Sequence, residues 1–206
     1  YQKLIVREPN SQVLIIGDLH SSFHSLCDII NENRHLFDGK SLVLKHGHYI
    51  IFLGDIVDRG PYSVELLLLT LYLKKNNPDQ VIIINGNHED YYMHNATQGV
   101  EMLSSEARLQ FGDRHPAVAE ITRLLYFLPS TVFLNYNNEW HHLSHGAFDI
   151  KHGVNSDILR NWLGDNTSYI VAEPTDWGHG GYQTHDSKWG DFDQLYRGYI
   201  TDDHNG

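Results

Sequence analysis

Cysteine is nearly absent from this 206-residue sequence, which contains only Cys27. One cysteine cannot form an internal disulfide, so the cysteine content does not tie the fold to an oxidising compartment. Long hydrophobic runs are absent too. The longest, such as residues 64–73, are too short and interrupted to cross a bilayer, and the N-terminal residues do not resemble a secretory signal. We therefore expect a soluble protein in a reducing, cytoplasmic setting.

Basic residues are also scarce. The sequence has 15 Lys and Arg against 26 Asp and Glu, a formal net charge of -11. This charge opposes attraction to nucleic acid and to anionic membrane surfaces, so neither is an expected partner. The sequence begins at Tyr1 and ends in a polar stretch, 201–206. We therefore expect a fragment of a longer chain, whose parent can carry a targeting signal outside this segment.

Hydrophobic residues make up 41% of the sequence, enough to bury the core of one domain spanning residues 1–206. Short apolar runs rich in β-branched residues are typical of central strands buried on both faces. They occupy residues 13–16, 49–53 and 81–84. Apolar residues at helical spacing lie between these runs, and Pro61 is placed suitably for a helix start. The two stripes are Phe23, Leu26, Cys27 and Ile30, and Val64, Leu67, Leu68 and Leu71.

This alternation of strand and helix patterns predicts an α/β fold with a largely parallel sheet and right-handed crossovers. The second half of the sequence has weaker patterns. A helix is expected at about 116–127, followed by a hairpin whose two strands, 131–134 and 140–143, are joined by Asn137 and Asn138. Residues 161–206 show no clear periodicity, and we expect loops there.

A glycine followed by potential metal ligands comes at the end of each of the first three predicted strands. The segments are Gly-Asp-Leu-His at 17–20, Gly-Asp-Ile-Val-Asp-Arg-Gly at 54–60 and Gly-Asn-His-Glu at 86–89. Because the carboxyl ends of parallel strands meet at one crevice, these segments should lie together. Their oxygen and nitrogen donors suit Mn, Fe or Zn. The candidate ligands are Asp18, His20, Asp55, Asn87 and His88.

Each segment has an ordinary explanation when it is taken alone. Gly-Asp is a common turn dipeptide, and a lone His20 would more often be a satisfied surface or core histidine. Asn87 alone would be a turn residue, and Arg59 alone an exposed ion-pair partner. The pattern recurs at three successive strand ends, and two of the segments contain a histidine. This recurrence favours a functional site over coincidence.

The three segments, in this order, resemble the signature motifs of the phosphoprotein phosphatase family of metallophosphoesterases, the serine/threonine phosphatases. The resemblance continues through Leu-Pro at 128–129 to His-Gly at 145–146 and covers residues 13–149. It implies the calcineurin-like metallophosphoesterase fold, with parallel and mixed sheets flanked by helices. In this sequence that fold would be incomplete at its C-terminus.

The resemblance also implies two divalent metal ions. By motif position, Asp18, His20 and Asp55 would hold one ion, and Asp55, Asn87 and His145 the other, with Asp55 bridging. Manganese is the expected ion in vitro, with iron or zinc as alternatives. Two cations so placed can share a hydroxide that attacks phosphorus directly, without a phosphoenzyme.

Further roles follow from the same motif positions. Arg59 would grip the phosphate oxygens in bidentate fashion, together with Asn87. His88 would donate a proton to the leaving alkoxide, while Asp58 accepts its other N–H. Glu89 would support the site structurally.

Two features depart from the family pattern. Ser21 follows His20 where the family usually has glycine. The family also completes its second metal site with a later histidine, preceded by an arginine that contacts phosphate, and neither can be placed here. Residues 189–191 (Trp-Gly-Asp) resemble the segment shortly before that arginine. His179, His185 and His204 are possible substitutes for the missing ligand, although loop histidines are the more usual explanation.

The expected function is hydrolysis of phosphoserine and phosphothreonine in proteins by a metal-dependent phosphoric monoester hydrolase. Three alternatives stay open. Two use the same metal chemistry, with phosphotyrosine or a dinucleotide polyphosphate as substrate. The third is a non-catalytic binding module that keeps the fold and has lost a metal.

Overall fold

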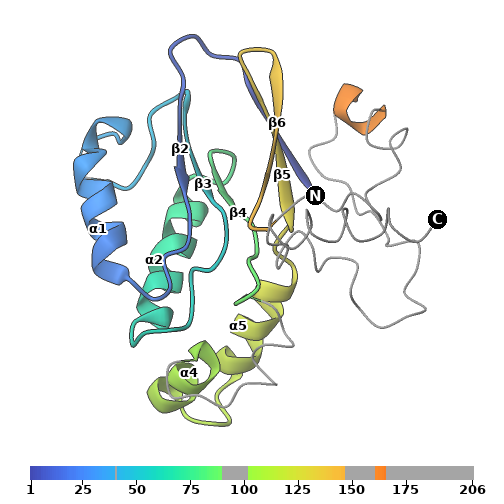
Figure 1. Ribbon diagram of the computed structural model, residues 1–206. Helices are drawn as coiled ribbons and strands as arrows, with labels where there is room; N and C mark the ends of the chain where they lie inside the picture. Colours follow the sequence, from blue (N-terminus) through green and yellow to red (C-terminus); the bar gives the residue numbers. More distant parts are fainter. Residues whose placement is uncertain (40, 90–101, 147–160, 166–206) are drawn as a thin grey trace, which may run out of the picture.

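Two three-stranded sheets form the centre of the computed structural model, which describes residues 1–39, 41–89, 102–146 and 161–165 (Figure 1). The first sheet is wholly parallel in the order β2-β3-β4. The second has the order β1-β5-β6, with β1 parallel and β6 antiparallel to β5. The strands are β1 (Gln2–Val6), β2 (Gln12–Ile16), β3 (His48–Phe52), β4 (Val81–Ile83), β5 (Thr131–Tyr136) and β6 (Glu139–Ser144).

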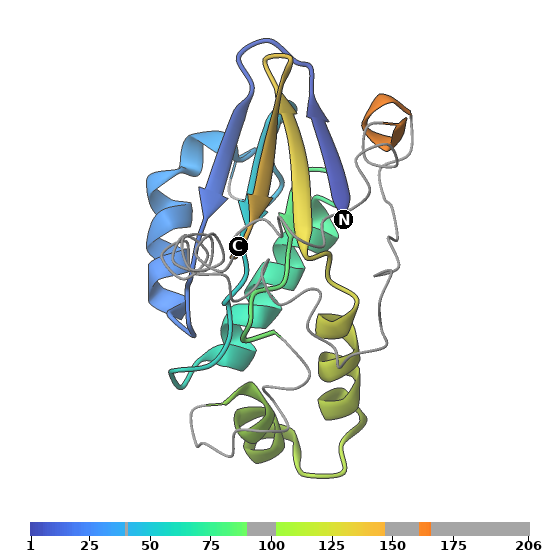
Figure 2. The same ribbon diagram turned by 45° about the vertical axis from the view of Figure 1, so that its right-hand side comes forward.

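The sheets pack face to face, and helices cover the outer face of the parallel sheet (Figures 1 and 2). Ile51 and Ile82 point into a buried cluster shared with Val132 of the second sheet. The alternate residues Ile50 and Phe52 pack instead with the helical layer. The helices are α1 (Phe23–Glu32), η1 (Arg34–Leu36), α2 (Ser63–Asn76), α4 (Leu103–Phe111) and α5 (Pro116–Tyr126). The combination of sheets with packed helices confirms the expected α/β architecture.

The three predicted parallel strands are present, but their burial differs. β3 lies between two neighbours, and residues 49–52 are each at most 8% exposed. β2 is an edge strand of its sheet, and Ile15 is 44% exposed. The prediction of burial on both faces is therefore wrong for β2. An apolar run shows that a strand can be buried, but it does not give the strand's place in the sheet.

The predicted apolar stripe of α2 is also partly wrong. Leu68 is 56% exposed, whereas Leu66, Thr70 and Leu73 are fully buried. Six of the 14 residues of this helix are leucines, and they lie on several sides, so spacing alone does not single out the face that packs on the sheet. Pro61 precedes the first helical residue, Ser63, by two positions.

The second half agrees with the sequence pattern in its main elements. α5 begins at Pro116, where the missing N–H of proline is harmless. Asn137 and Asn138 both have positive φ angles, 53° and 65°, as a two-residue hairpin turn requires. β1 and α4 were not predicted, because neither carries a distinctive pattern. None of the helices in the described ranges has the length and apolar character needed to cross a membrane.

Residues 161–164, expected to be a loop, form a helical turn. Trp162 is 3% exposed, and its ring meets Phe133 edge to face at a centroid distance of 5.7 Å. Lys3 Nζ donates to the backbone oxygens of Trp162 and Asp165, at 2.6 Å and 3.0 Å. The turn is therefore packed on the second sheet. The remaining loop prediction, for residues 166–206, lies outside the described residues.

Candidate metal centre

The loops that follow β2, β3, β4 and β6 meet at one end of the two sheets. Two glycines allow this approach. Gly54 has a φ of +94°, and a Cβ there would overlap the backbone nitrogen of Gly86. A Cβ on Gly86 would in turn overlap the carboxylate of Asp55. The loops after β3 and β4 can therefore come this close only because both positions lack a side chain.

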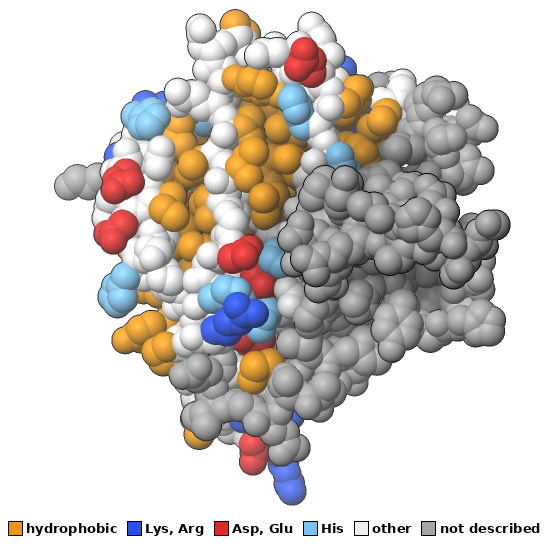
Figure 3. Space-filling model, viewed as in Figure 1, with side chains coloured by type: hydrophobic (Ala, Val, Ile, Leu, Met, Phe, Trp, Pro, Cys, Tyr) orange, Lys and Arg blue, Asp and Glu red, His pale blue; other side chains and the backbone are white. Residues whose placement is uncertain are grey.

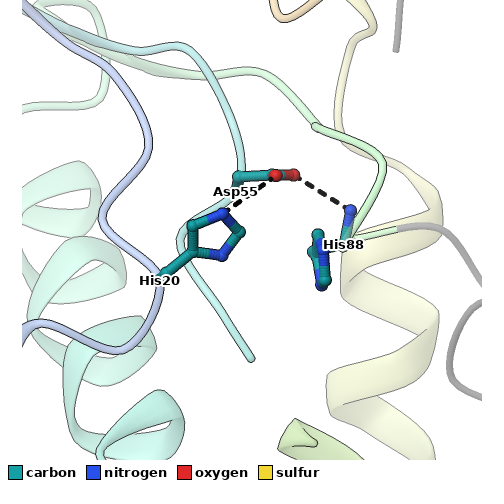
Figure 4. A group of neighbouring side chains, drawn as sticks. All are labelled: His20, Asp55 and His88. Atoms are coloured by element: carbon teal, nitrogen blue, oxygen red, sulfur yellow. Dashed lines mark hydrogen bonds and ion pairs between the residues drawn. The ribbon is translucent and has the colours of Figure 1, made fainter. Parts of the chain in front are cut away.

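Asp55 lies at the centre of this region and is 3% exposed. Its Oδ2 atom is 3.3 Å from Nε2 of His20 and 3.3 Å from Nε2 of His145. Its Oδ1 atom accepts the backbone N–H of His88 at 3.0 Å (Figure 4). Burial disfavours the charged carboxylate, but the hydrogen bond with His145 and that from the His88 backbone outweigh burial and lower the pKa of Asp55. A charged Asp55 is the form that binds cations.

Two groups of side chains could each hold a metal ion, and Asp55 belongs to both. His20, Asp55 and His88 form the first group, and Asp18, Asp55 and His145 the second. Nδ1 of His145 is 3.4 Å from Oδ1 of Asp18. Figure 3 shows acidic, histidine and basic side chains gathered at one place on this face, at the lower end of the strands. The predicted convergence of strand ends is therefore present.

The division of ligands differs from the one that the resemblance implies. In the structure Asp18 lies with His145, and His20 lies with His88. The resemblance instead pairs Asp18 with His20 and leaves His88 free as an acid. All of these residues share one small region, so the choice of ligands for each ion stays a prediction.

The side chain of Asn87 lies beside Asp55 and His145. Its amide oxygen faces Nε2 of His145 at 3.0 Å and the carboxylate of Asp55. Turning the amide over would instead let its NH₂ group donate to both Asp55 oxygens and to His145. In one orientation the amide oxygen can be a cation ligand, and in the other the NH₂ group satisfies its neighbours. Nδ1 of His145 is buried and makes no hydrogen bond, and its contact with Oδ1 of Asp18 at 3.4 Å is an ion pair only. The donor set therefore suits a divalent metal ion.

The electrostatics of His145 agree with an anionic surrounding. Its partial burial disfavours the imidazolium form, but the hydrogen bond and charge of Asp55, with smaller effects of Asp18 and Glu89, raise its pKa. The acidic groups around His145 thus favour a positive charge at this place, as a bound metal ion would supply.

Glu89 links the loop that follows β3 to the loop that follows β4. Its carboxylate accepts the backbone N–H groups of Asp55, Ile56 and Gly86 at 2.7 to 2.8 Å. Glu89 is 1% exposed, and burial raises its pKa despite these hydrogen bonds. The residue therefore supports the site through the backbone, in agreement with the structural role expected for it.

His88 is held between Asp58 and Arg59. Its Nδ1 atom is 3.0 Å from Oδ2 of Asp58, which is fully buried, and its Nε2 atom is 3.0 Å from a guanidinium nitrogen of Arg59. The other Asp58 oxygen accepts the N–H of Leu103 at 2.7 Å. A guanidinium can only donate, so Nε2 is the acceptor and Nδ1 carries the proton. Asp58 thus orients the imidazole, and Arg59, which is exposed, covers its outer nitrogen.

Three contacts of Asp58 in this site were not predicted from the sequence. The hydroxyls of Ser21 and Ser63 bind the backbone of Asp58, and the N-terminus of α4 binds its carboxylate. Leu103 is 45 residues from Asp58, so no local pattern signals that bond. Ser21 was noted only as a departure from glycine. The possible further ligands His179, His185 and His204 lie outside the described residues.

Comparison with known proteins shows the family of this chain. The family model of the calcineurin-like phosphoesterases matches residues 11–198. The chain belongs to this family. The catalytic subunit of serine/threonine-protein phosphatase 4 from Eremothecium gossypii is 38% identical over 93 residues, which is 43% of this chain and 27% of that protein. The calcineurin-like chain therefore spans about a quarter of the length of this curated relative.

Solved structures support the calcineurin-like fold. A protein serine/threonine phosphatase from Saccharomyces cerevisiae, described as similar to human phosphatase PP5, superposes with a TM-score of 0.66 and 21% identity. The match covers 91% of this chain and 51% of that one. A cold-active protein-tyrosine phosphatase of a Shewanella species has a TM-score of 0.54 at 18% identity, with coverages of 79% and 47%. At these identities the likeness shows the fold alone.

Proposed function

We propose that this chain carries the metal-binding core of a phosphomonoesterase that acts on phosphoserine and phosphothreonine in proteins. The observation that carries the proposal is the position of Asp55, whose buried carboxylate belongs to both groups of potential metal ligands. Beside it lie the imidazole of His88, oriented by Asp58, and the exposed guanidinium of Arg59. The site thus combines cation ligands, a proton donor and a phosphate-binding group.

The proposed metal ligands are Asp18, His20, Asp55, Asn87 and His145. Two divalent cations bound by these residues would supply an activated water and neutralise phosphate charge. Mn²⁺ is the proposed ion in vitro, with iron or zinc as alternatives, because oxygen and imidazole ligands suit all three.

The remaining residues would act on the substrate. Arg59 presents a planar fork that matches two phosphate oxygens, and Asn87 would assist it. When Arg59 turns toward phosphate, it leaves Nε2 of His88, which its guanidinium contacts in the structure. Nε2 can then take up a proton from solvent, and the resulting imidazolium can give that proton to the leaving oxygen while its Nδ1–H stays on Asp58.

The substrate class rests on weaker support than the chemistry. The curated relative that matches this chain is named as a serine/threonine phosphatase, and the resemblance at residues 58–60 and 88–89 agrees with that name. The net charge of -11 supports the absence of nucleic acid and anionic membranes among the partners. The single cysteine accords with a cytoplasmic setting.

A substrate panel tests the proposal. The protein, extended along its gene to the length of the curated relatives, is loaded with Mn²⁺ and given p-nitrophenyl phosphate, phosphoserine and phosphothreonine peptides, phosphotyrosine peptides and diadenosine tetraphosphate. We expect the highest kcat/KM for phosphoserine or phosphothreonine peptides. A large preference for phosphotyrosine or for the dinucleotide would move the assignment to that substrate. No turnover of any substrate, together with no bound metal, would favour a binding module.

The 206-residue chain is measured beside the extended one. Since no final ligand of the second ion can be assigned among the described residues, we expect the shorter chain to hold that ion weakly and to turn over slowly. Loss of a ligand should exceed the 10- to 100-fold effect on affinity that is typical of residues around the ligands. Equal, tight binding of two ions by both chains would show that a histidine already present, such as His179, His185 or His204, completes the site.

A further inference from the structure

Two serine hydroxyls hold the backbone of Asp58 from both sides. The hydroxyl oxygen of Ser63 accepts the N–H of Asp58 at 3.0 Å, and the hydroxyl of Ser21 donates to the carbonyl oxygen of Asp58 at 3.0 Å. The two hydroxyl oxygens are 2.5 Å apart. Because the proton of Ser21 is used on Asp58, Ser63 is the donor between the serines. The ring of hydrogen bonds is therefore closed, and both serines are at most 2% exposed.

This ring lies where the backbone is strained. Ser21, Asp58 and Arg59 all have left-handed backbone conformations, with φ angles of 61°, 67° and 63°. Residues with a side chain rarely adopt these angles, and they keep them only where surrounding contacts hold them in place. The two serine hydroxyls satisfy both backbone polar groups of Asp58, so they provide such contacts.

The orientation of this backbone decides how His88 is presented. The carboxylate of Asp58 binds Nδ1 of His88, and the next residue along the chain, Arg59, binds Nε2. Both nitrogens of the imidazole are therefore contacted from one short segment. A rotation of the peptide between Asp58 and Arg59 would change both contacts together.

We propose that Ser21 and Ser63 are positioning residues for phosphate ester hydrolysis, which orient Asp58 and through it the proton-donating nitrogen of His88. The role in hydrolysis rests on the proposed function. Neither serine contacts the reacting atoms, and both act through Asp58.

Two substitutions of Ser21 separate the effect of its hydroxyl from that of its backbone. Ser21→Ala removes the hydroxyl and keeps a side chain at a strained φ. Ser21→Gly removes the hydroxyl and relieves the strain. Ser25→Ala is the matched control, because Ser25 also shares a hydroxyl hydrogen bond with another serine, Ser22 at 2.6 Å, but in an exposed position on α1. Ser63→Ala and the double variant with Ser21→Ala measure the coupling between the two hydroxyls.

The first measurement needs no activity. In the metal-free 206-residue chain, the Nδ1 proton of His88 is followed by ¹⁵N-edited NMR. We expect a slowly exchanging signal in the unaltered protein and in Ser25→Ala, and a shifted, faster-exchanging signal in both Ser21 variants. An unchanged His88 signal in Ser21→Ala and Ser21→Gly would overturn the proposal. A changed signal in Ser21→Ala alone would also overturn it, because the cause would be the backbone and not the hydroxyl.

The second measurement uses the extended, Mn²⁺-loaded protein. The proton from His88 matters for an alkyl leaving group such as serine, and little for p-nitrophenolate, which is a good leaving group. We expect both Ser21 variants to lower kcat for a phosphoserine peptide by about tenfold or more, with p-nitrophenyl phosphate changed by less than about twofold. Equal losses on both substrates would indicate a purely structural role and overturn the proposal. If the unaltered protein hydrolyses neither substrate, the proposed function fails, and the NMR result alone decides the positioning of His88.

Discussion

At the scale of single residues, Asp55 has the largest expected effect. Asp55→Asn keeps the size of the side chain and removes the charge that both groups of ligands share. We therefore expect loss of both bound cations and of turnover. Elemental analysis after reconstitution with Mn²⁺ measures the stoichiometry, and Asp28→Asn, at an exposed position on α1, is the control. Unchanged metal content in Asp55→Asn would contradict the bridging role.

His88 poses a sharper question, because the structure places it within reach of His20 and Asp55 as a possible ligand. As a proton donor, His88→Asn should slow hydrolysis of phosphoserine peptides by roughly 10²- to 10⁴-fold and leave metal content nearly intact. Steady-state kinetics and elemental analysis on the same sample check both parts. An emptied metal site would make His88 a ligand and leave the proton donor unassigned.

The residues that the sequence could and could not indicate differ in how local their partners are. Asp18, His20, Asp55 and His88 could be predicted to meet because each follows a strand of one parallel sheet. The hydrogen bonds of Ser21 and Ser63 could not, because they depend on left-handed backbone angles at Ser21, Asp58 and Arg59, which residues with a side chain seldom adopt. The contact from α4 depends on a helix that has no clear sequence signal.

At the scale of elements, α4 caps the start of α2. The carboxylate of Glu106 accepts the N–H groups of Ser63 and Val64 at 2.8 Å and 3.0 Å. These groups have no partner within the helix. Glu106→Ala should therefore lower the free energy of unfolding by about 1–2 kcal/mol. Urea denaturation measures the change, with Glu120→Ala on the exposed face of α5 as the control. A loss no greater than that of the control would show that water caps α2 equally well.

The strand β6 adds a dependence of stability on pH. Burial lowers the pKa of His142 below its ordinary 6.5. The unfolded chain therefore takes up a proton at a higher pH than the folded one, and stability should be lost as pH falls from 6.5 through the folded pKa. His142→Phe should remove this part of the dependence, because an apolar ring would remain against Phe133. Thermal unfolding across this pH range is the measurement. His141→Gln, at an exposed position, is the control, and equal slopes in His142→Phe and the unaltered protein would contradict the assignment.

Elements with strong local patterns were predictable, and those defined by long-range contacts were not. α5 has Pro116 at its start, and the hairpin has two asparagines in its turn, so both are readable from short segments. β1 pairs with β5, more than a hundred residues away. β2 and β4 are both edge strands, yet only β2 is partly exposed, so the exposure depends on which other elements cover each strand. Sequence periodicity indicates which face of a helix or strand is apolar, but not which other element will cover that face.

At the scale of the whole molecule, the candidate site joins the two sheets. His145 follows β6 of the second sheet, whereas Asp18 and Asp55 follow β2 and β3 of the first. Metal binding should therefore stabilise their packing. At free metal 100-fold above the Kd, the expected gain is about 2.7 kcal/mol. The Tm should rise with Mn²⁺ in the unaltered protein, and by less in His145→Ala, which loses a potential ligand of one ion. A Tm independent of Mn²⁺ in a metal-loaded protein would contradict this linkage.

The contact between Gly54 and Gly86 bears on how this chain can diverge. Both glycines are required by the closeness of two backbones, and neither belongs to the groups of potential metal ligands. A related chain without a metal site could therefore replace Asp55 and His88, but would still need both glycines to keep the two loops this close. Both glycines in a related sequence would therefore indicate this fold. The residues proposed as metal ligands and proton donor would be needed to indicate activity.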